Sequence, residues 1–202
     1  RPRDTAAFDR VNAKLMKNQR ITEKEETTFQ REMVNSPSLY QYMSENSEEY
    51  SLFVFIPYMF GTTYYGIQSC RKKAVLIPCL HDEAYAYMKI LKQSFAQTAG
   101  MVFLSEPEQL LAQTLYGVSG RAFQSLGTGI DTEIRGDAVR FRRKYQIDSP
   151  FLLYAGRKDA GKKVDVLIQY FLAYKKHSPS KLKLILIGGG NIEFPKNGDV
   201  ID

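Results

Sequence analysis

From residue 50 onward, short apolar runs rich in β-branched and aromatic residues alternate with longer segments that have helical periodicity. This alternation is typical of parallel sheets, because two parallel strands need a long crossover, usually a helix, between them. The sequence therefore predicts an α/β fold in which parallel sheets carry helices on both faces. The predicted strands are residues 52–57, 74–79, 101–104, 122–126, 151–155 and 182–187.

Helices are predicted where apolar residues recur at positions i, i+3, i+4 and i+7. A polar, helix-prone segment at residues 17–34 and a helix start at Ser36-Pro37 precede the first strand. Ser105 and Glu108 have the spacing of a capping box, which marks another helix start. Two apolar stripes, each expected on one helix, are Ala84, Met88, Leu91 and Phe95, and Val164, Leu167, Ile168 and Phe171.

A domain boundary is predicted at GTGID, residues 127–131, where a strand ends in two glycines before a charged helix at residues 136–145. We therefore predict two domains, residues 1–129 and residues 130–202. Residues 135–183 contain 13 Lys or Arg and 4 Asp, whereas the whole chain has a net charge of +6. This local excess favours one anionic ligand, although a solvated basic face has the same composition.

Composition and missing motifs exclude several classes of protein. The longest apolar runs are far shorter than the roughly 20 residues that cross a bilayer as a helix. Cys70 and Cys79 are too few for a disulfide scaffold, so we interpret both as reduced and the protein as cytoplasmic. The motifs of P-loop, serine-hydrolase, zinc-protease and dithiol redox sites are missing. Asp-x-Asp, which holds a divalent cation, is also missing, so we predict a site without metal or cofactor.

The first candidate site follows the strand at residues 151–155, because ligands of parallel α/β sheets lie beyond the carboxyl ends of the strands. This strand runs into GRKDAGKK, residues 156–163, where a helix begins. Gly156 lets backbone approach a ligand, while Arg157 and Lys162 add positive charge to that of the helix start. The combination suits a diphosphate; a solvated basic turn is the alternative that these residue types leave open.

Two further loops follow predicted strands. His81 comes after the strand at residues 74–79 and could bind a sugar hydroxyl or a phosphate, or be an ordinary loop residue beside a helix cap. The glycines after the strand at residues 182–187 could admit a nucleobase or ribose, although glycine turns after strands are common. These glycines are Gly188, Gly189 and Gly190.

The stretch PFLLYAGR at residues 150–157 is followed by Lys162, five residues after the arginine, and by VDVLI at residues 164–168. Together with the later strand that ends in Ile-Gly-Gly-Gly, this pattern resembles the retaining GT-B glycosyltransferases called group 1 or family 4. Upstream segments that also look like this family are FIPYMFGTT, IPCLHDE, FLSE and GTGID, so the resemblance spans roughly residues 30–200.

The resemblance implies two Rossmann-like domains. Residues 1–129 would be the last part of the acceptor-side domain, and residues 130–202 the first part of the nucleotide-sugar-binding domain. The implied reaction moves a sugar from a nucleoside-diphosphate sugar to a hydroxyl of a saccharide or lipid-linked acceptor, with retention. No nucleic-acid partner is implied, whereas many enzymes of this kind make peripheral contact with a membrane surface.

By the same resemblance, Arg157 and Lys162 hold the donor diphosphate, and His81 is the catalytic contact to the donor sugar. Gly156 and the glycines at 188–190 would lie near the nucleotide and the sugar.

The chain departs from the family pattern in three places. Lys163 replaces a glycine that usually follows the lysine. The glycine-rich loop of the first domain is missing, and so are the two glutamates, eight residues apart, that hold the sugar in the second. Because the chain also opens on Arg1-Pro2 instead of Met, we expect an internal fragment that is inactive by itself.

Two other functions stay open from the sequence. Another GT-B enzyme, such as a sugar-nucleotide epimerase or a phosphorylase, would share the anion-binding domain. A nucleic-acid-binding module would use the basic span at residues 135–183, with binding that falls steeply with salt. Its candidate stacking residues are Tyr145, Tyr154, Tyr170 and Tyr174.

Overall fold

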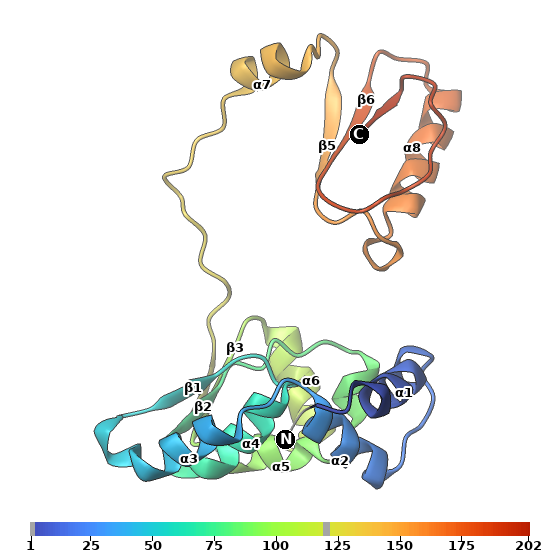
Figure 1. Ribbon diagram of the computed structural model, residues 1–202. Helices are drawn as coiled ribbons and strands as arrows, with labels where there is room; N and C mark the ends of the chain where they lie inside the picture. The colour runs from blue at the N-terminus through green and yellow to red at the C-terminus, as the bar shows by residue number, and fades with distance from the viewer. Residues whose placement is uncertain (1–2, 119–121) are drawn as a thin grey trace. The chain divides into compact units, whose positions relative to one another are not determined.

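The computed structural model describes residues 3–118 and 122–202 of the chain. The chain divides into two compact units, Arg1–Ile130 (unit 1) and Asp131–Asp202 (unit 2). Each unit contains a sheet of parallel strands together with helices (Figure 1). The predicted α/β class is therefore confirmed, and both sheets are Rossmann-like. Within the two described segments, the structure contains no helix that is both long and apolar enough to cross a membrane.

Unit 1 has a four-stranded parallel sheet in the order β1-β2-β3-β4. The strands are β1 (Phe53–Phe55), β2 (Ala74–Leu76), β3 (Gly100–Phe103) and β4 (Ala122–Ser125). The first two are shorter than predicted because Pro57 and Pro78 have no N–H and cannot continue the ladder. The carbonyl of Pro78 accepts instead from the Tyr58 N–H at 2.9 Å, so the two segments stay paired as they leave the sheet.

The helices of unit 1 are α1 (Thr5–Met16), α2 (Glu23–Glu32), α3 (Pro37–Glu45), α4 (Gly61–Ser69), α5 (Leu91–Gln97) and α6 (Glu106–Tyr116), with 3₁₀ helices η1 (Ser47–Glu49), η2 (Arg71–Lys73) and η3 (Ala84–Tyr87). Helix α1 lies outside the predicted helices, although Asp4 caps it by accepting from the Ala7 N–H at 2.9 Å. The predicted segment at residues 17–34 contains α2, which begins with a capping box formed by Thr22 and Glu25.

The apolar stripe within residues 84–95 is split between two elements, so its assignment to one helix is wrong. Helix η3 comes first, and α5 begins only at Leu91. Between them, the buried Glu26 carboxylate accepts from the backbone N–H groups of Lys89 at 3.0 Å and Ile90 at 2.9 Å. These amides are therefore not available for a continuous helix. The stripe residues of α5 are nevertheless fully buried.

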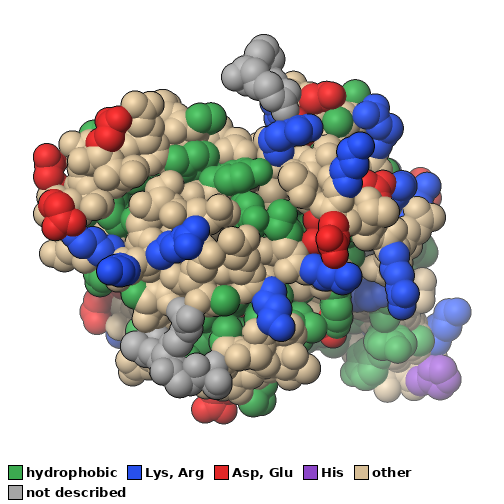
Figure 2. Space-filling model, turned by 90° about the horizontal axis from the view of Figure 1, so that it is seen from below, with side chains coloured by type: hydrophobic (Ala, Val, Ile, Leu, Met, Phe, Trp, Pro, Cys, Tyr) green, Lys and Arg blue, Asp and Glu red, His purple; other side chains and the backbone are tan. Residues whose placement is uncertain are grey.

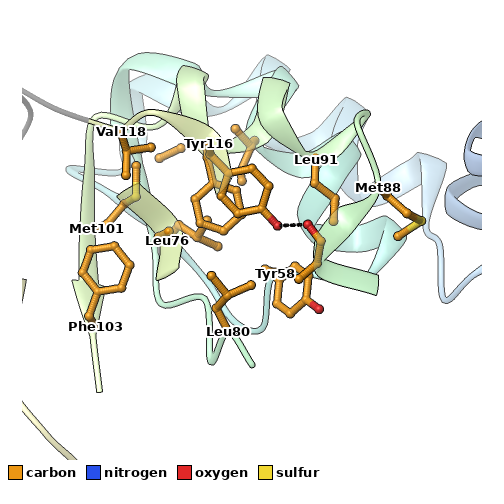
Figure 3. Close-up of a cluster of buried hydrophobic side chains, with 14 of the residues drawn as sticks. Tyr58, Leu76, Leu80, Met88, Leu91, Met101, Phe103, Tyr116 and Val118 are labelled. Carbon is orange, nitrogen blue, oxygen red and sulfur yellow. Dashed lines mark hydrogen bonds between the residues drawn. The ribbon is translucent and has the colours of Figure 1, made fainter. Parts of the chain in front are cut away.

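Alternate strand residues form the buried face of the sheet in unit 1. Leu76, Met101 and Phe103 lie in the core cluster shown in Figure 3. Right-handed crossovers in a sheet with sequential strand order place α4, α5 and α6 on this same face. Val54 and Leu126, on the opposite face, are more than half exposed. The core therefore lies between the sheet and the helices.

Unit 2 has a three-stranded parallel sheet. Its elements are α7 (Ala138–Tyr145), β5 (Phe151–Ala155), the 3₁₀ helix η4 (Ala160–Lys162), α8 (Val164–His177), β6 (Lys183–Ile187) and β7 (Val200–Ile201). Val164, Ile168 and Phe171 of α8 form a buried cluster with Leu184 and Leu186 of β6, as the second apolar stripe predicts. Strand β7 lies outside the predicted strands.

Candidate functional site

The residues selected from the sequence fall on both units, and the structure groups them by unit. Gly156, Arg157 and the glycines at 188–190 come together in unit 2, whereas His81 belongs to unit 1. On the face of the molecule in Figure 2, basic and acidic side chains are interspersed and do not form a patch of one charge.

The loops after β5 and β6 are held together by their backbones. Parallel strands β5 and β6 end at the same edge of the sheet, with Ala155 paired to Ile187. Beyond this pair, the Gly156 N–H donates to the Ile187 carbonyl at 2.9 Å, and the Lys158 N–H donates to the Gly189 carbonyl at 2.8 Å. The cationic turn and the glycine turn, far apart in the sequence, are therefore adjacent.

Two of the three glycines in the later turn are required by this contact. A Cβ atom on Gly188 would lie 2.0 Å from the Gly156 carbonyl oxygen, and one on Gly190 would lie 2.7 Å from the Lys158 carbonyl oxygen. Both glycines have positive φ, +129° and +99°. The Cβ position of Gly189 has no atom within 4 Å. The sequence suggested that these glycines leave room for a ligand. In the structure, the missing side chains of Gly188 and Gly190 leave room for the backbone of the loop after β5.

The cations after β5 differ in their availability to a ligand. The Lys158 side chain is only 7% exposed and forms an ion pair with Asp202. The Arg157 side chain is 76% exposed, and its Nε lies 3.6 Å from Asp159 Oδ2, which is a weak surface contact. Lys162 is also exposed. Lys163 is exposed as well, so Arg157, Lys162 and Lys163 are the cations of this turn that a ligand can reach.

The turn leads directly into the N-terminus of α8, a helix of 14 residues. The residue at its N-cap position, Lys163, makes no side-chain hydrogen bond to the first turn. The first amides of a helix have no partner within the helix, and its N-terminus has a partial positive charge. An anion beside Arg157 and Lys162 would therefore meet free amides and the exposed Lys163, and the Asp165 carboxylate is the acidic group of this first turn.

Lys163 has φ of +54°, in the left-handed region that glycine adopts easily. The backbone at Lys163 therefore has a conformation that glycine adopts more easily than lysine. A left-handed non-glycine residue costs roughly 1–2 kcal/mol, which is partly offset because glycine loses more freedom on folding. We expect Lys163→Gly to raise the free energy of unfolding of unit 2 by about 0.5–1 kcal/mol.

This prediction is measured by urea unfolding, with the transition of unit 2 followed through its resolved amide NMR signals. Gln169→Gly is the matched control, because Gln169 is an exposed residue in the middle of α8, where glycine is expected to destabilise by about 1 kcal/mol. A loss of stability in Lys163→Gly of the same size as in this control would contradict the account.

In unit 1, His81 lies in the loop after β2, at a cavity of about 430 Å³. The loop after β3 and the start of α6 form the other wall. The lining residues are Cys79, Leu80, His81, Asp82, Leu104, Ser105, Pro107, Glu108 and Leu111. The His81 side chain is exposed, and it makes no hydrogen bond to another residue in the part of the chain that the structure describes. The ring is therefore free to contact a ligand.

The residues after His81 are held by partners that sequence reasoning missed. The Tyr87 hydroxyl donates to Asp82 Oδ1 at 2.7 Å, and the buried Tyr58 hydroxyl donates to Glu83 Oε1 at 2.9 Å. Burial, with the Glu83 carboxylate as a second cause, strongly raises the pKa of Tyr58, so this hydroxyl stays protonated and remains a donor. No sequence spacing indicated either tyrosine. The loop is thus anchored around an unengaged histidine.

Cys79 lines the same cavity but does not have the character of a nucleophile. Burial, and to a lesser degree the nearby Glu108 carboxylate, raises the pKa of its thiol. A thiol with a raised pKa remains protonated at neutral pH and reacts slowly. The cavity therefore offers His81, and not Cys79, as its chemically useful group.

The predicted capping box at Ser105 is only half formed. Ser105 Oγ accepts from the Glu108 N–H at 3.3 Å, as predicted. The Glu108 carboxylate, however, accepts from the N–H groups of Leu104 and Leu80 instead of that of Ser105. The prediction that Glu108 accepts from the Ser105 N–H is therefore wrong. The Glu108 carboxylate binds the Leu80 N–H, from a distant loop, and the Leu104 N–H instead.

Across residues 3–118 and 122–202, no cluster of three or more His, Cys, Asp or Glu side chains could hold a metal ion. The candidates for function are two loop sites at the carboxyl ends of parallel strands: the His81 loop of unit 1 and the turn after β5 in unit 2. No protein-family model matches this chain, and no curated protein matches it either.

Proposed function

We propose that this chain belongs to a retaining, metal-independent glycosyltransferase that binds a nucleoside-diphosphate sugar at the turn after β5. One observation carries the proposal. Two exposed cations, Arg157 and Lys162, flank a helix N-terminus that has no side-chain cap. Such a site matches the charge and the oxygen atoms of a diphosphate.

The chemistry of sugar transfer requires this kind of site. When the bond between the anomeric carbon and the diphosphate breaks, negative charge develops on the leaving phosphate oxygens. The Arg157 guanidinium can donate two parallel hydrogen bonds to phosphate, whereas the Lys162 ammonium acts as a point charge. Both stabilise the departing diphosphate without a metal ion. The same contacts hold the donor before transfer begins.

His81 supplies the second part of the proposal. In a glycosyltransferase, an exposed imidazole at the end of β2 would donate to or accept from a hydroxyl of the donor sugar. The acceptor would be a saccharide or lipid-linked hydroxyl. The resemblance also requires two glutamates eight residues apart, which are not in this sequence, so the activity is proposed for a longer protein that contains this chain.

Arg157→Ala is expected to lower kcat/KM of that longer enzyme by more than about tenfold, because a charge-assisted contact to phosphate contributes roughly 1.5–3 kcal/mol. The assay offers nucleoside-diphosphate sugars with different bases and sugars, and identifies the product by mass and anomeric configuration. A glycosylated acceptor with retained configuration supports the proposal. An epimer or a sugar phosphate as product would assign another reaction.

The control is Lys176→Ala, which removes an exposed cation from the opposite end of α8. Its kcat/KM should equal that of the wild type. If Arg157→Ala matches Lys176→Ala, Arg157 does not hold the diphosphate. On the chain itself, titration with inorganic pyrophosphate should shift the amide NMR signals of residues 156–164, and shifts spread over both units would contradict a site at this turn.

A further inference from the structure

One buried carboxylate joins the loops that form the His81 cavity. The Glu108 side chain lies in the first turn of α6 and is part of a residue that is only 6% exposed. Its Oε1 accepts from the Leu80 N–H at 2.7 Å, and its Oε2 accepts from the Leu104 N–H at 2.6 Å. Leu80 follows β2 and Leu104 follows β3. Glu108 therefore connects the ends of two neighbouring strands.

A carboxylate suits this position better than any other side chain. Each of its two oxygens is needed as an acceptor, because both partners are N–H donors. The carboxylate also lies at the positive end of α6, where the helix favours negative charge. An amide at this position would offer one acceptor only and would direct its NH₂ group at a backbone N–H. The contact is thus specific for glutamate.

The Leu80 bond acts one residue before His81. Leu80 is also preceded by Cys79, whose φ of +51° places the backbone in the left-handed region. After His81, the side chains of Asp82 and Glu83 are bound to tyrosines. The backbone around His81 is therefore fixed on both sides, while its imidazole has no partner in the described part of the chain.

We propose that Glu108 is a positioning residue that fixes the direction of the His81 side chain at the cavity of unit 1. The role of His81 in this inference rests on the proposed function. The connection that Glu108 makes between the two loops is independent of that function. Each oxygen of Glu108 already accepts from a backbone amide, so we assign Glu108 a positioning role and not a direct role in the reaction. It acts by keeping the His81 backbone in place before the donor arrives, which avoids reorganisation during the reaction.

The first experiment is a double-mutant cycle of Glu108→Gln and His81→Ala in the longer enzyme. Each single variant is expected to lower kcat by about tenfold, since misplacing a reacting group by less than 1 Å already slows a reaction. The double variant should be no slower than His81→Ala, because Glu108 acts through His81. If the fold loss of kcat in the double variant equals the product of the two single losses, Glu108 does not act through His81. That result would overturn the proposal.

The matched control is Glu106→Gln, two residues earlier in the same helix turn, where the side chain is exposed. It should leave kcat unchanged. An equal loss in Glu106→Gln would assign the effect to the charge of α6 and overturn the positioning role.

The second experiment needs neither activity nor a variant that folds well. In the wild-type chain, the amides of Leu80 and Leu104 should exchange with solvent more slowly than exposed loop amides, because both donate to the buried Glu108 carboxylate. Fast exchange at Leu80 and Leu104 would overturn the connection itself. If both amides are protected, while His81→Ala leaves kcat unchanged, the loop connection stands and the proposed function of His81 fails.

Discussion

Leu91→Ala is expected to lower the free energy of unfolding of unit 1 by about 2–5 kcal/mol. Leu91 lies at the start of α5 and is fully buried in the core cluster between the helices and the sheet (Figure 3). Alanine removes most of the buried side chain and leaves a cavity that the surrounding residues fill only in part. The measurement is urea unfolding, followed through amide NMR signals that belong to each unit separately, because two units need not unfold together.

Leu110→Ala is the matched control for this prediction. It makes the same chemical change on α6, but the Leu110 residue is 61% exposed. We expect its free energy of unfolding to stay within about 0.5 kcal/mol of the wild type. Equal losses for the two variants would mean that α5 does not cover the buried face of the sheet as described. A loss confined to the unit 2 signals would contradict the assignment of Leu91 to unit 1.

The sequence predicted β1 to β6 and most helices because their signals are local, but it missed β7 and the helices α1 and α4. Apolar runs indicate buried parallel strands, and the spacing of Val164, Ile168 and Phe171 indicates one face of a helix. Strand ends were less predictable, since they depend on where neighbouring segments stop pairing. Pro57 and Pro78 were visible in the sequence as residues that end a ladder, and they would have given better bounds for β1 and β2.

Errors arose where a distant residue changes the local outcome. The stripe at residues 84–95 is broken by Glu26, a carboxylate more than 60 residues away in the sequence, which takes the two amides before α5. Glu108 binds the Leu80 amide in the same way and leaves the capping box incomplete. A buried carboxylate must satisfy its oxygens wherever donors are available, and sequence spacing does not contain that information.

The candidate site shows the same division. The motif after β5 predicted a cationic turn at a helix start, and both features are present. The sequence could not show that Lys158 is paired with Asp202 while Arg157 is exposed, because it does not contain the direction in which each side chain points. It also could not show that Gly188 faces another loop, since this contact depends on how β5 and β6 align.

The close contact between Gly188 and the Gly156 backbone predicts a large loss of stability in unit 2 when Gly188 is replaced. We expect Gly188→Ala to destabilise unit 2 by about 2–5 kcal/mol, because a methyl group would overlap the Gly156 carbonyl and a φ of +129° is strained for alanine. The neighbouring atom is backbone, so it cannot move aside as a flexible side chain could. Hydrogen exchange should become faster at the Gly156 and Lys158 amides, which join the two loops.

Gly189→Ala is the control, one residue further along the same turn. Its Cβ position has no atom within 4 Å, so stability and hydrogen exchange should remain close to wild type. The two variants also test the site. Gly188→Ala should weaken pyrophosphate binding, because it disturbs Gly156, the residue directly before Arg157. Gly189→Ala does not disturb Gly156, so pyrophosphate binding should stay close to that of the wild type. Equal stability of the two variants would mean that the loops after β5 and β6 are not packed backbone to backbone, and the adjacency of the cationic and glycine turns would then be wrong.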